Sequence, residues 1–201
     1  MSKSIDRRAA MEELFDREVN RRTAPGHGWI DEVREPFVSL CIKLEEVVEA
    51  GKTIFICGNG GSAAQAQHFC AEVIGRYRRD SRPAPAISLT VDTSALTSLG
   101  NDFGFNEVFL RQAQALMREG DLLIGLSTSG TSANVVEALS WARENGQTTA
   151  ALTGEGGGTM ASVSDLCIAI PSNETDLIQE RHLVLLHILA EVAERVLTAE
   201  Q

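Results

Sequence analysis

The fold is decided by residues 52–72, KTIFICGNGGSAAQAQHFCAE. The apolar, β-branched run 53–57 predicts a buried strand of a parallel sheet, and the good helix formers that follow predict a helix over 63–74. The glycines between them place a turn directly before the N-terminus of that helix. Free backbone N–H groups and the positive end of the helix dipole suit an anion such as a phosphate. Ser62 adds a hydroxyl at this point, so the stretch predicts a phosphate-binding loop.

Length and composition limit the possible classes of protein. The chain has 201 residues, of which 43% are hydrophobic and 23% charged, as in an ordinary soluble domain with a full core. A net charge of -10 argues against binding nucleic acid through bulk electrostatics. The sequence shows neither an apolar leader nor a run of 18 apolar residues, so a cytoplasmic location is expected. Reduced thiols are expected in that compartment at the four scattered cysteines, Cys41, Cys57, Cys70 and Cys167.

Apolar runs and helical patterns alternate from residue 51 onward. Strands are predicted at residues 53–57, 86–90, 121–126, 148–153 and 166–170. Helices are predicted at residues 63–74, 106–117, 133–145 and 176–198, with a short turn at 158–163. Short apolar strands that alternate with helices are typical of a parallel sheet covered on both faces. The sequence therefore predicts an α/β fold, a three-layer α/β/α sandwich with a parallel five-stranded sheet.

Two helices are predicted before this alternation begins. Residues 4–22 have the pattern of a charged amphipathic helix, and a second helix runs over 30–50 until Gly51 ends it. Neither has a strand partner of its own. We expect them to pack on the edge of the domain or, because so much apolar surface is offered, against another subunit. The chain is accordingly divided into an N-terminal helical extension used in oligomer packing, residues 1–50, and an α/β domain, residues 51–201.

Residues 126–134, LSTSGTSAN, form a second stretch suited to an anion. Five hydroxyl residues and one glycine occupy positions 127–132, between a predicted strand and a predicted helix. Hydroxyl and backbone N–H donors can surround a phosphate without any basic residue. The alternative is an ordinary helix start with Ser129 or Ser132 as the N-cap. Ligands of parallel sheets bind beyond the carboxyl ends of the strands, so two such loops in one sheet favour a phosphate site.

Acid–base chemistry is indicated by side chains on two helices. His68 and Glu72 lie four residues apart, hence on one face of the helix after the glycine loop. Because that helix is mostly apolar, we expect the carboxylate to be partly buried; the alternative is a solvent-facing glutamate. On the last helix, Gln179 and His187 are two four-residue steps apart. By its own pattern His187 is more typical of a histidine in the core.

These motifs together resemble the phosphosugar isomerase (SIS) fold and, within it, the phosphoheptose isomerase family. The resemblance covers residues 30–199, with the motifs in the family's order. The stretches that carry it are Gly58-Asn59-Gly60-Gly61-Ser62, His68-Phe69 with Glu72, Gly75-Arg76-Tyr77, Gly100-Asn101-Asp102-Phe103-Gly104-Phe105, Ser127-Thr128-Ser129-Gly130, Leu152-Thr153-Gly154 and Ile178-Gln179-Glu180.

The resemblance implies interconversion of sedoheptulose 7-phosphate and D-glycero-D-manno-heptose 7-phosphate, the first step toward nucleotide-activated heptose for surface polysaccharide. An aldose–ketose isomerase moves a proton between neighbouring carbons through an enediol, which requires a base and an acid that exchange roles. By resemblance Glu72 is the base and His187 its partner. Some family members bind zinc, which the resemblance assigns here to His68, Glu72, Gln179 and His187. Four chains of the family associate through helices, with active sites at subunit interfaces, so a homotetramer is expected.

Contacts to the sugar phosphate follow from the same resemblance. The residues that it implies are Asn59, Gly60, Gly61, Ser62, Glu72, Asn101, Asp102, Ser127, Thr128, Ser129, Ser132 and Gln179. Asn101 and Asp102 precede an aromatic loop that we expect to be exposed unless a ligand or another subunit covers it. As an alternative, Asp102 is the N-cap of a helix. Arg76 and Tyr77 are further candidate contacts.

The sequence departs from the isomerase pattern within residues 63–67, AAQAQ. The sequence of these five residues is more similar to that of a sister group of the same fold. That group binds the initiator of chromosome replication and needs no isomerase chemistry. That sister group lacks the pair that Glu72 and His187 form here, so an enzyme is the main hypothesis and a binding protein the alternative. A sugar-phosphate sensor in a regulator is a third hypothesis, which the lack of an attached DNA-reading module disfavours.

Overall fold

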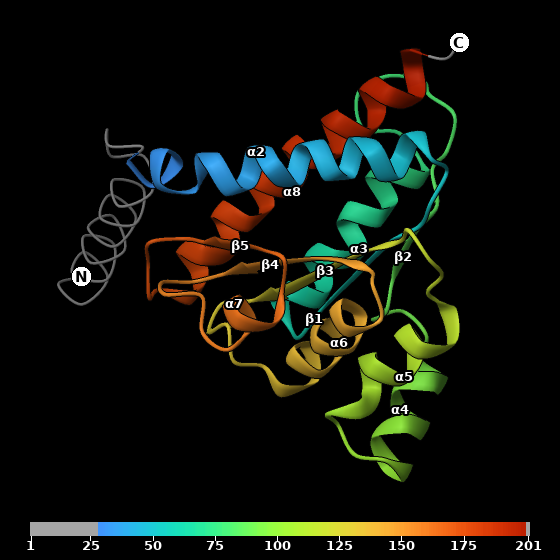
Figure 1. Cartoon of the computed structure of the whole chain (residues 1–201), viewed down its shortest axis with the longest axis vertical. Coiled ribbons are helices and arrows are strands. Elements are labelled where there is room, and N and C mark those ends of the chain that lie inside the picture. The colour runs from blue at the N-terminus through green and yellow to red at the C-terminus, as the bar shows by residue number, and fades with distance from the viewer. Residues whose placement is uncertain (1–27, 200–201) are drawn as a thin grey trace, which may run out of the picture.

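The computed structural model describes residues 28–199, so the predicted helix at 4–22 and His27 lie outside the described residues. Figure 1 shows a central sheet with helices above and below it. All five strands run parallel in the order β2-β1-β3-β4-β5. Their bounds are β1 Ile54–Gly58, β2 Ala86–Ser88, β3 Leu122–Ser127, β4 Thr148–Thr153 and β5 Leu166–Ala169.

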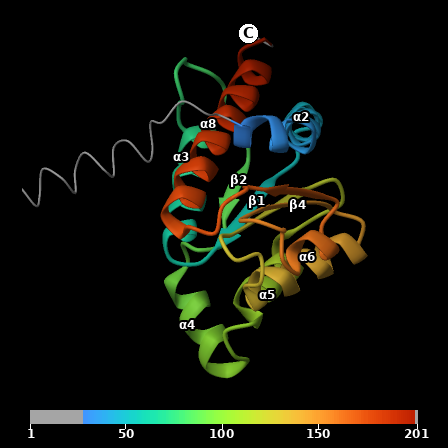
Figure 2. The same ribbon diagram turned by 90° about the vertical axis from the view of Figure 1, so that its left-hand side faces the viewer.

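Seven helices within the described residues surround the sheet. Figures 1 and 2 show α2 and α8 on one side of it and α4, α5 and α6 on the other. The predicted three-layer α/β/α sandwich is therefore confirmed. The bounds are α2 Gly28–Glu49, α3 Gly61–Ile74, α4 Thr93–Asp102, α5 Glu107–Leu116, α6 Ala133–Glu144, α7 Met160–Val163 and α8 Thr175–Ala199.

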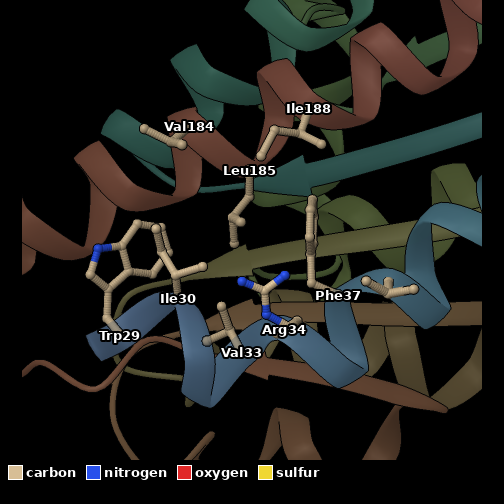
Figure 3. Close-up of a pocket in the computed structure, with 9 residues that line it drawn as sticks. Trp29, Ile30, Val33, Arg34, Phe37, Val184, Leu185 and Ile188 are labelled. Carbon is tan, nitrogen blue, oxygen red and sulfur yellow. The ribbon is translucent and has the colours of Figure 1, made fainter. Parts of the chain in front are cut away.

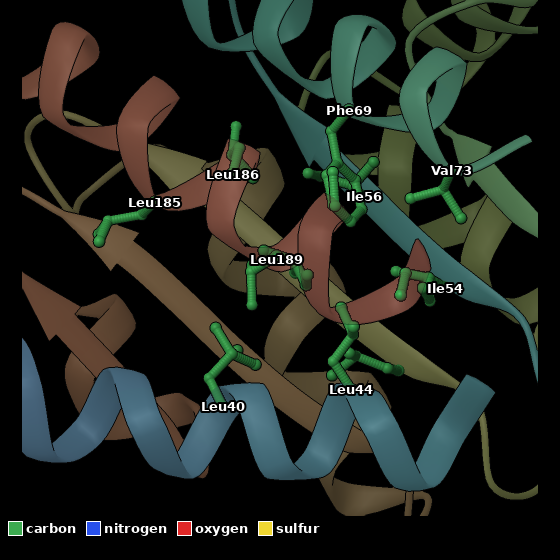
Figure 4. Packing of buried hydrophobic residues seen from close by; sticks show 14 of the residues in the cluster. Leu40, Leu44, Ile54, Ile56, Phe69, Val73, Leu185, Leu186 and Leu189 are labelled. Carbon is green, nitrogen blue, oxygen red and sulfur yellow. The ribbon is translucent and has the colours of Figure 1, made fainter. Parts of the chain in front are cut away.

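Two hydrophobic cores lie on opposite faces of the sheet because successive strand side chains alternate. On β1, Ile54 and Ile56 face the core under α2, α3 and α8, whereas Phe55 and Cys57 face the core under α5 and α6. Figure 4 shows the first core, where leucines of α2 and α8 meet the β1 isoleucines and Phe69 of α3. Strands that are buried on both faces have continuous apolar sequences, so the sequence alone was enough to predict them.

The second predicted helix belongs to the core of its own chain. On α2, Val33, Leu40 and Leu44 are buried in the first core, and the helix packs on α8 and β5. We expected the apolar surface of α2 to pack against another subunit. Part of that surface is instead covered by α8 and β5 of the same chain. The division of the chain at residue 50 stays a prediction.

The helix α4 is a correction to the sequence analysis, which expected a loop around Asn101 and Asp102. Its residues Thr93–Asp102 include Thr, Ser and Gly, which form helices weakly. Asp92 compensates as an N-cap, since its side chain accepts the N–H of Ala95 at 2.9 Å. Asp102 ends this helix, and Asn106 rather than Asp102 is the N-cap residue of α5, so the N-cap alternative for Asp102 is wrong.

The strands β1 and β3 position the candidate site. They are neighbours in the sheet, and Gly58 at the end of β1 lies opposite Leu126, one residue before the end of β3. Ser127 in turn lies opposite Thr153 at the end of β4. The glycine loop, the serine loop and the loop after β4 therefore leave the sheet side by side, at the edge where parallel sheets bind ligands.

Candidate active site

The glycine loop, residues 58–61, connects β1 to α3. Gly60 has φ +55°, a conformation that side chains rarely adopt, and this residue turns the chain from the strand into the helix. α3 then begins at Gly61, and the hydroxyl-bearing Ser62 is buried within its first turn. The N-terminus of a helix of 14 residues is thus presented at the ligand-binding edge of the sheet.

The serine loop, residues 127–132, carries a cluster of hydroxyl groups. The Oγ atom of Ser127 lies 2.8 Å from that of Ser132 and 3.3 Å from that of Ser129. Ser132 is the N-cap residue of α6, but its side chain makes no capping hydrogen bond. Ser132 therefore occupies the N-cap position without capping the helix through its side chain, because its hydroxyl contacts Ser127 instead.

An asparagine pair joins the two loops. The amide of Asn59 donates to Oδ1 of Asn134 at 2.9 Å, and the amide of Asn134 donates back to Oδ1 of Asn59 at 2.9 Å. Asn134 is buried in the first turn of α6. In the sequence, only its position two residues after Ser132 points to the site, so Asn134 is a site residue that the residue pattern does not predict.

The serine loop is also fixed from its other side, by the loop after β4. Gly154 donates its N–H to the carbonyl oxygen of Thr128 at 3.0 Å. A Cβ atom at Gly154 would lie 2.3 Å from that same oxygen, so only glycine allows the two loops to approach this closely. The carbonyl of Thr128 is thus occupied within the protein.

The predicted acid–base residues gather between α3 and α8. The Nε2 atom of His68 lies 3.0 Å from Nε2 of His187, and the two rings meet edge to face. Oε1 of Glu72 lies 3.6 Å from the same His68 nitrogen. The Glu72 side chain is 21% exposed, as expected for a carboxylate on a mostly apolar helix. One chain therefore brings Glu72 and His187 to the same imidazole nitrogen, Nε2 of His68.

Gln179, on the same helix as His187, lies against the glycine loop. A Cβ atom built on Gly61 would lie 2.6 Å from Nε2 of Gln179, so the amide covers the start of α3. The backbone carbonyl of Gln179 accepts a hydrogen bond of 2.6 Å from Nε2 of Gln65. In this position the Gln179 side chain can contact a ligand held by the glycine loop.

Asn101 and Asp102 lie elsewhere in the molecule. Both are exposed at the end of α4, where the Asn101 amide donates to Asp102 at 2.7 Å. Figures 1 and 2 show α4 projecting from the side of the sheet opposite to α8. The structure therefore does not bring these two residues together with the histidine pair of their own chain.

Comparison with known proteins agrees with this geometry. A family model described as SIS domain matches residues 31–154. Phosphoheptose isomerases of Aliarcobacter butzleri and Roseiflexus sp. are 47% and 44% identical to this chain; the matches cover 84% and 91% of this chain and 89% and 90% of those proteins. The solved phosphoheptose isomerase of Neisseria gonorrhoeae superposes with a TM-score of 0.85 at 38% identity, over 92% of this chain and 99% of that one.

The chain belongs to the phosphoheptose isomerase family of SIS-domain proteins. The family resemblance drawn from the motifs is thereby confirmed. In this phosphoheptose isomerase family member, no helix among the described residues is long and apolar enough to cross a membrane.

The other titratable groups near the sheet belong to the core of this family member. His182 is fully buried, and its Nε2 donates to the carbonyl of Thr153 at 3.0 Å, so it is a core residue. Burial lowers the pKa of His182 to about 4 and raises the pKa of the thiol of Cys57 to about 12. All four cysteines are free, and burial raises the pKa of each, so none is an activated nucleophile.

Proposed function

We propose that this chain interconverts sedoheptulose 7-phosphate and D-glycero-D-manno-heptose 7-phosphate. The observation that carries the proposal is the contact of His68 with both His187 and Glu72, on two helices that also border the glycine loop. Two relatives that are 47% and 44% identical to this chain bear the name phosphoheptose isomerase. The geometry thus supports the acid–base chemistry that the name requires.

The glycine and serine loops are proposed to hold the sugar phosphate. The helix N-termini of α3 and α6 supply N–H donors, and the hydroxyls of Ser62, Ser127, Ser129 and Ser132 supply further ones. Asn59, Gly60, Gly61 and Thr128 complete the phosphate and sugar contacts. The hydroxyl cluster of the serine loop now satisfies itself, so a bound phosphate would replace hydrogen bonds between hydroxyls with stronger, charge-assisted ones.

Proton transfer is assigned to two residues. Glu72 removes the proton from the carbon beside the carbonyl and returns it to the neighbouring carbon, since both carbons lie on one edge of the enediol. His187 donates a proton to the carbonyl oxygen as the enediol forms and receives one from the neighbouring hydroxyl. Gln179 is proposed to donate its amide to the developing oxyanion.

A zinc ion is proposed at His68, Glu72, Gln179 and His187. Ligand atoms about 2.0–2.1 Å from a tetrahedral ion are separated by about 3.3 Å, close to the 3.0 Å and 3.6 Å found around the His68 Nε2 atom. Within residues 28–199, no three His, Cys, Asp or Glu side chains are already arranged to hold a metal ion, so small side-chain movements are required. When bound, zinc would polarise the sugar oxygens and stabilise negative charge on them.

Assembly into a homotetramer is proposed from the surface of α2 and α8. Between these helices lies an apolar pocket whose lining includes Trp29, Ile30 and Val184 (Figure 3). Val38 on α2 and Ile188 on α8, which also line it, are 49% and 43% exposed, an unusual amount of apolar surface to leave to water. In such an assembly this surface would be buried between copies of the chain. The end of α4, with Asn101 and Asp102, would then be able to contact the active site of a neighbouring chain.

The product would enter synthesis of nucleotide-activated heptose in the cytoplasm, where sugar nucleotides are made for surface polysaccharide. This placement follows from the proposed substrate.

The proposal is tested by a turnover assay of the purified full chain on sedoheptulose 7-phosphate. We expect the parent chain to convert it, and Glu72→Gln and His187→Ala to lose most of the activity. Glu137→Gln, an exposed carboxylate on α6, is the matched control and should keep it. Absence of turnover by the parent chain, or full turnover by both site variants, would contradict the proposal and favour a non-catalytic binding protein of the same fold.

A further inference from the structure

We propose that Tyr77 is a positioning residue for the His187 imidazole and that Glu194 holds Tyr77 in place. This inference rests on the proposed function and assigns two residues that the family resemblance did not place in catalysis. Its first support is a ring contact: the Tyr77 and His187 rings stack with centroids 5.8 Å apart and an interplanar angle of 23°.

The stack restricts His187 from the side that the catalytic contacts leave open. His68 meets the edge of the His187 ring at 81°, whereas Tyr77 covers its face. An imidazole on a helix otherwise rotates about its terminal side-chain bond, which has a broad energy profile. With both neighbours in place, Nε2 of His187 stays directed at His68, within reach of the group that contains Glu72.

Glu194 fixes the segment that carries Tyr77. Its Oε1 atom accepts the backbone N–H of Arg78 and that of Arg79, each at 2.6 Å, and the residue is only 3% exposed. A buried carboxylate is costly unless hydrogen bonds compensate it. Two charge-assisted bonds to consecutive N–H groups compensate Oε1, while Oε2 is buried without a hydrogen-bond partner. The two bonds hold the backbone directly after Tyr77 against α8.

A second carboxylate on the same face of α8 reinforces this arrangement. Glu191 lies 3.4 Å from Arg78 and 3.8 Å from Arg79, while the Arg78 guanidinium lies 4.8 Å from the Tyr77 ring centroid. His187, Glu191 and Glu194 follow one another at steps of four and three residues, so they share one helix face. The helix that carries the catalytic imidazole therefore also anchors the tyrosine that covers it.

The decisive variants are Tyr77→Leu, which removes the ring, and Tyr77→Phe, which retains it. We expect Tyr77→Leu to lower kcat on the order of 10- to 100-fold, because a small misplacement of a catalytic group is costly, with little change in KM. Tyr77→Phe should stay close to the parent chain. Glu194→Met should lower kcat in the same direction as Tyr77→Leu.

A structural control separates positioning from loss of stability. Phe109→Leu removes a buried ring from the opposite core, which does not contact His187. It should lower the thermal midpoint while kcat at a permissive temperature stays unchanged. If Phe109→Leu lowers kcat as much as Tyr77→Leu at equal loss of stability, the positioning role is refuted.

A readout independent of turnover completes the test. In NMR spectra of the full chain, the His187 ring protons should carry a ring-current shift that Tyr77→Leu abolishes and Tyr77→Phe retains. If the parent chain does not convert sedoheptulose 7-phosphate, the proposed function fails. The NMR measurement still shows whether Tyr77 positions the His187 ring. An identical His187 signal in the parent chain and in Tyr77→Leu would overturn the inference, whatever the activity.

Discussion

Asn59 and Asn134 hold the glycine loop and the serine loop together through a reciprocal pair of amide hydrogen bonds, each 2.9 Å long. They are 75 residues apart in the sequence and meet only because β1 and β3 are neighbours in the sheet. A phosphate that takes donors from both loops requires a fixed distance between them. The asparagine pair therefore sets the geometry of the proposed phosphate site.

Replacement of Asn134 is expected to loosen that site. In Asn134→Ala the half-buried amide of Asn59 loses its partner, and loss of such a hydrogen bond costs about 0.5–1.5 kcal/mol. Because the loops then move relative to each other, KM for the sugar phosphate should rise by more than kcat falls. Asn145→Ala is the matched control, since Asn145 is exposed at the other end of α6 and its side-chain amide donates to the carbonyl of Trp141 in the same helix. Steady-state kinetics of both variants check this, and an equal KM in the two would contradict it.

Loss of a hydroxyl from the serine loop should weaken phosphate binding. Ser127→Ala and Ser132→Ala each remove one member of the 2.8 Å hydroxyl pair. A hydrogen bond to a charged group contributes about 1.5–3 kcal/mol, so KM should rise on the order of 10- to 100-fold. Ser140→Ala removes an outer hydroxyl of α6, which bonds to Glu144, and should have no effect on KM. Unchanged KM in both loop variants would exclude these hydroxyls as phosphate donors.

The predictability of the fold and of the site differs for a physical reason. Buried parallel strands are continuous apolar runs, so β4 was predicted with its observed bounds, Thr148–Thr153. α4 was missed because its weak helix formers obscure the capping signal at Asp92. In contrast, the Asn59–Asn134 pair and the Tyr77–His187 stack depend on which elements become neighbours, and residue patterns along the chain do not contain this information. The roles of the predicted site residues stay predictions that the variants above test.

A methyl group at residue 154 should destabilise the protein and the site together. The added Cβ atom would lie 2.3 Å from the carbonyl oxygen of Thr128, which forces the two loops apart. Overpacking of this kind costs about 1–3 kcal/mol or more. Gly100→Ala is the matched control, because its added Cβ would meet only Val108, at 3.9 Å. Urea unfolding should therefore show a loss of stability for Gly154→Ala and no loss for Gly100→Ala; equal stabilities would contradict the close approach.

Removal of metal tests the zinc proposal. Purified parent protein should contain zinc, and treatment with a chelator should lower both its zinc content and its thermal midpoint, because a ligand bound only by the folded state stabilises it. His68→Ala should bind far less zinc, since it removes the imidazole that lies near two of the other three proposed ligands, Glu72 and His187. Cys70→Ser, a free thiol on the same helix outside the proposed site, is the control and should retain zinc. Elemental analysis that finds no zinc in the parent chain would exclude the metal.

His182 should make the folded state sensitive to mild acid. Burial lowers its pKa to about 4, from an ordinary value of 6.5. The unfolded chain therefore binds a proton below pH 6.5 that the folded chain does not bind until about pH 4. Over that window the free energy of unfolding should fall, by a total on the order of 3 kcal/mol, whereas well above pH 6.5 this group contributes little to the pH dependence.

The measurement is urea unfolding of the parent chain and of His182→Gln from pH 7 down to pH 4.5, with chelator present so that metal release does not contribute. His182→Gln loses stability at pH 7 because the hydrogen bond to the Thr153 carbonyl is disturbed. Its free energy of unfolding should nevertheless decline less steeply below pH 6.5 than that of the parent chain, since the titrating group is gone. Parallel pH curves for the two proteins would show that another group causes the acid lability, and would remove His182 from that role.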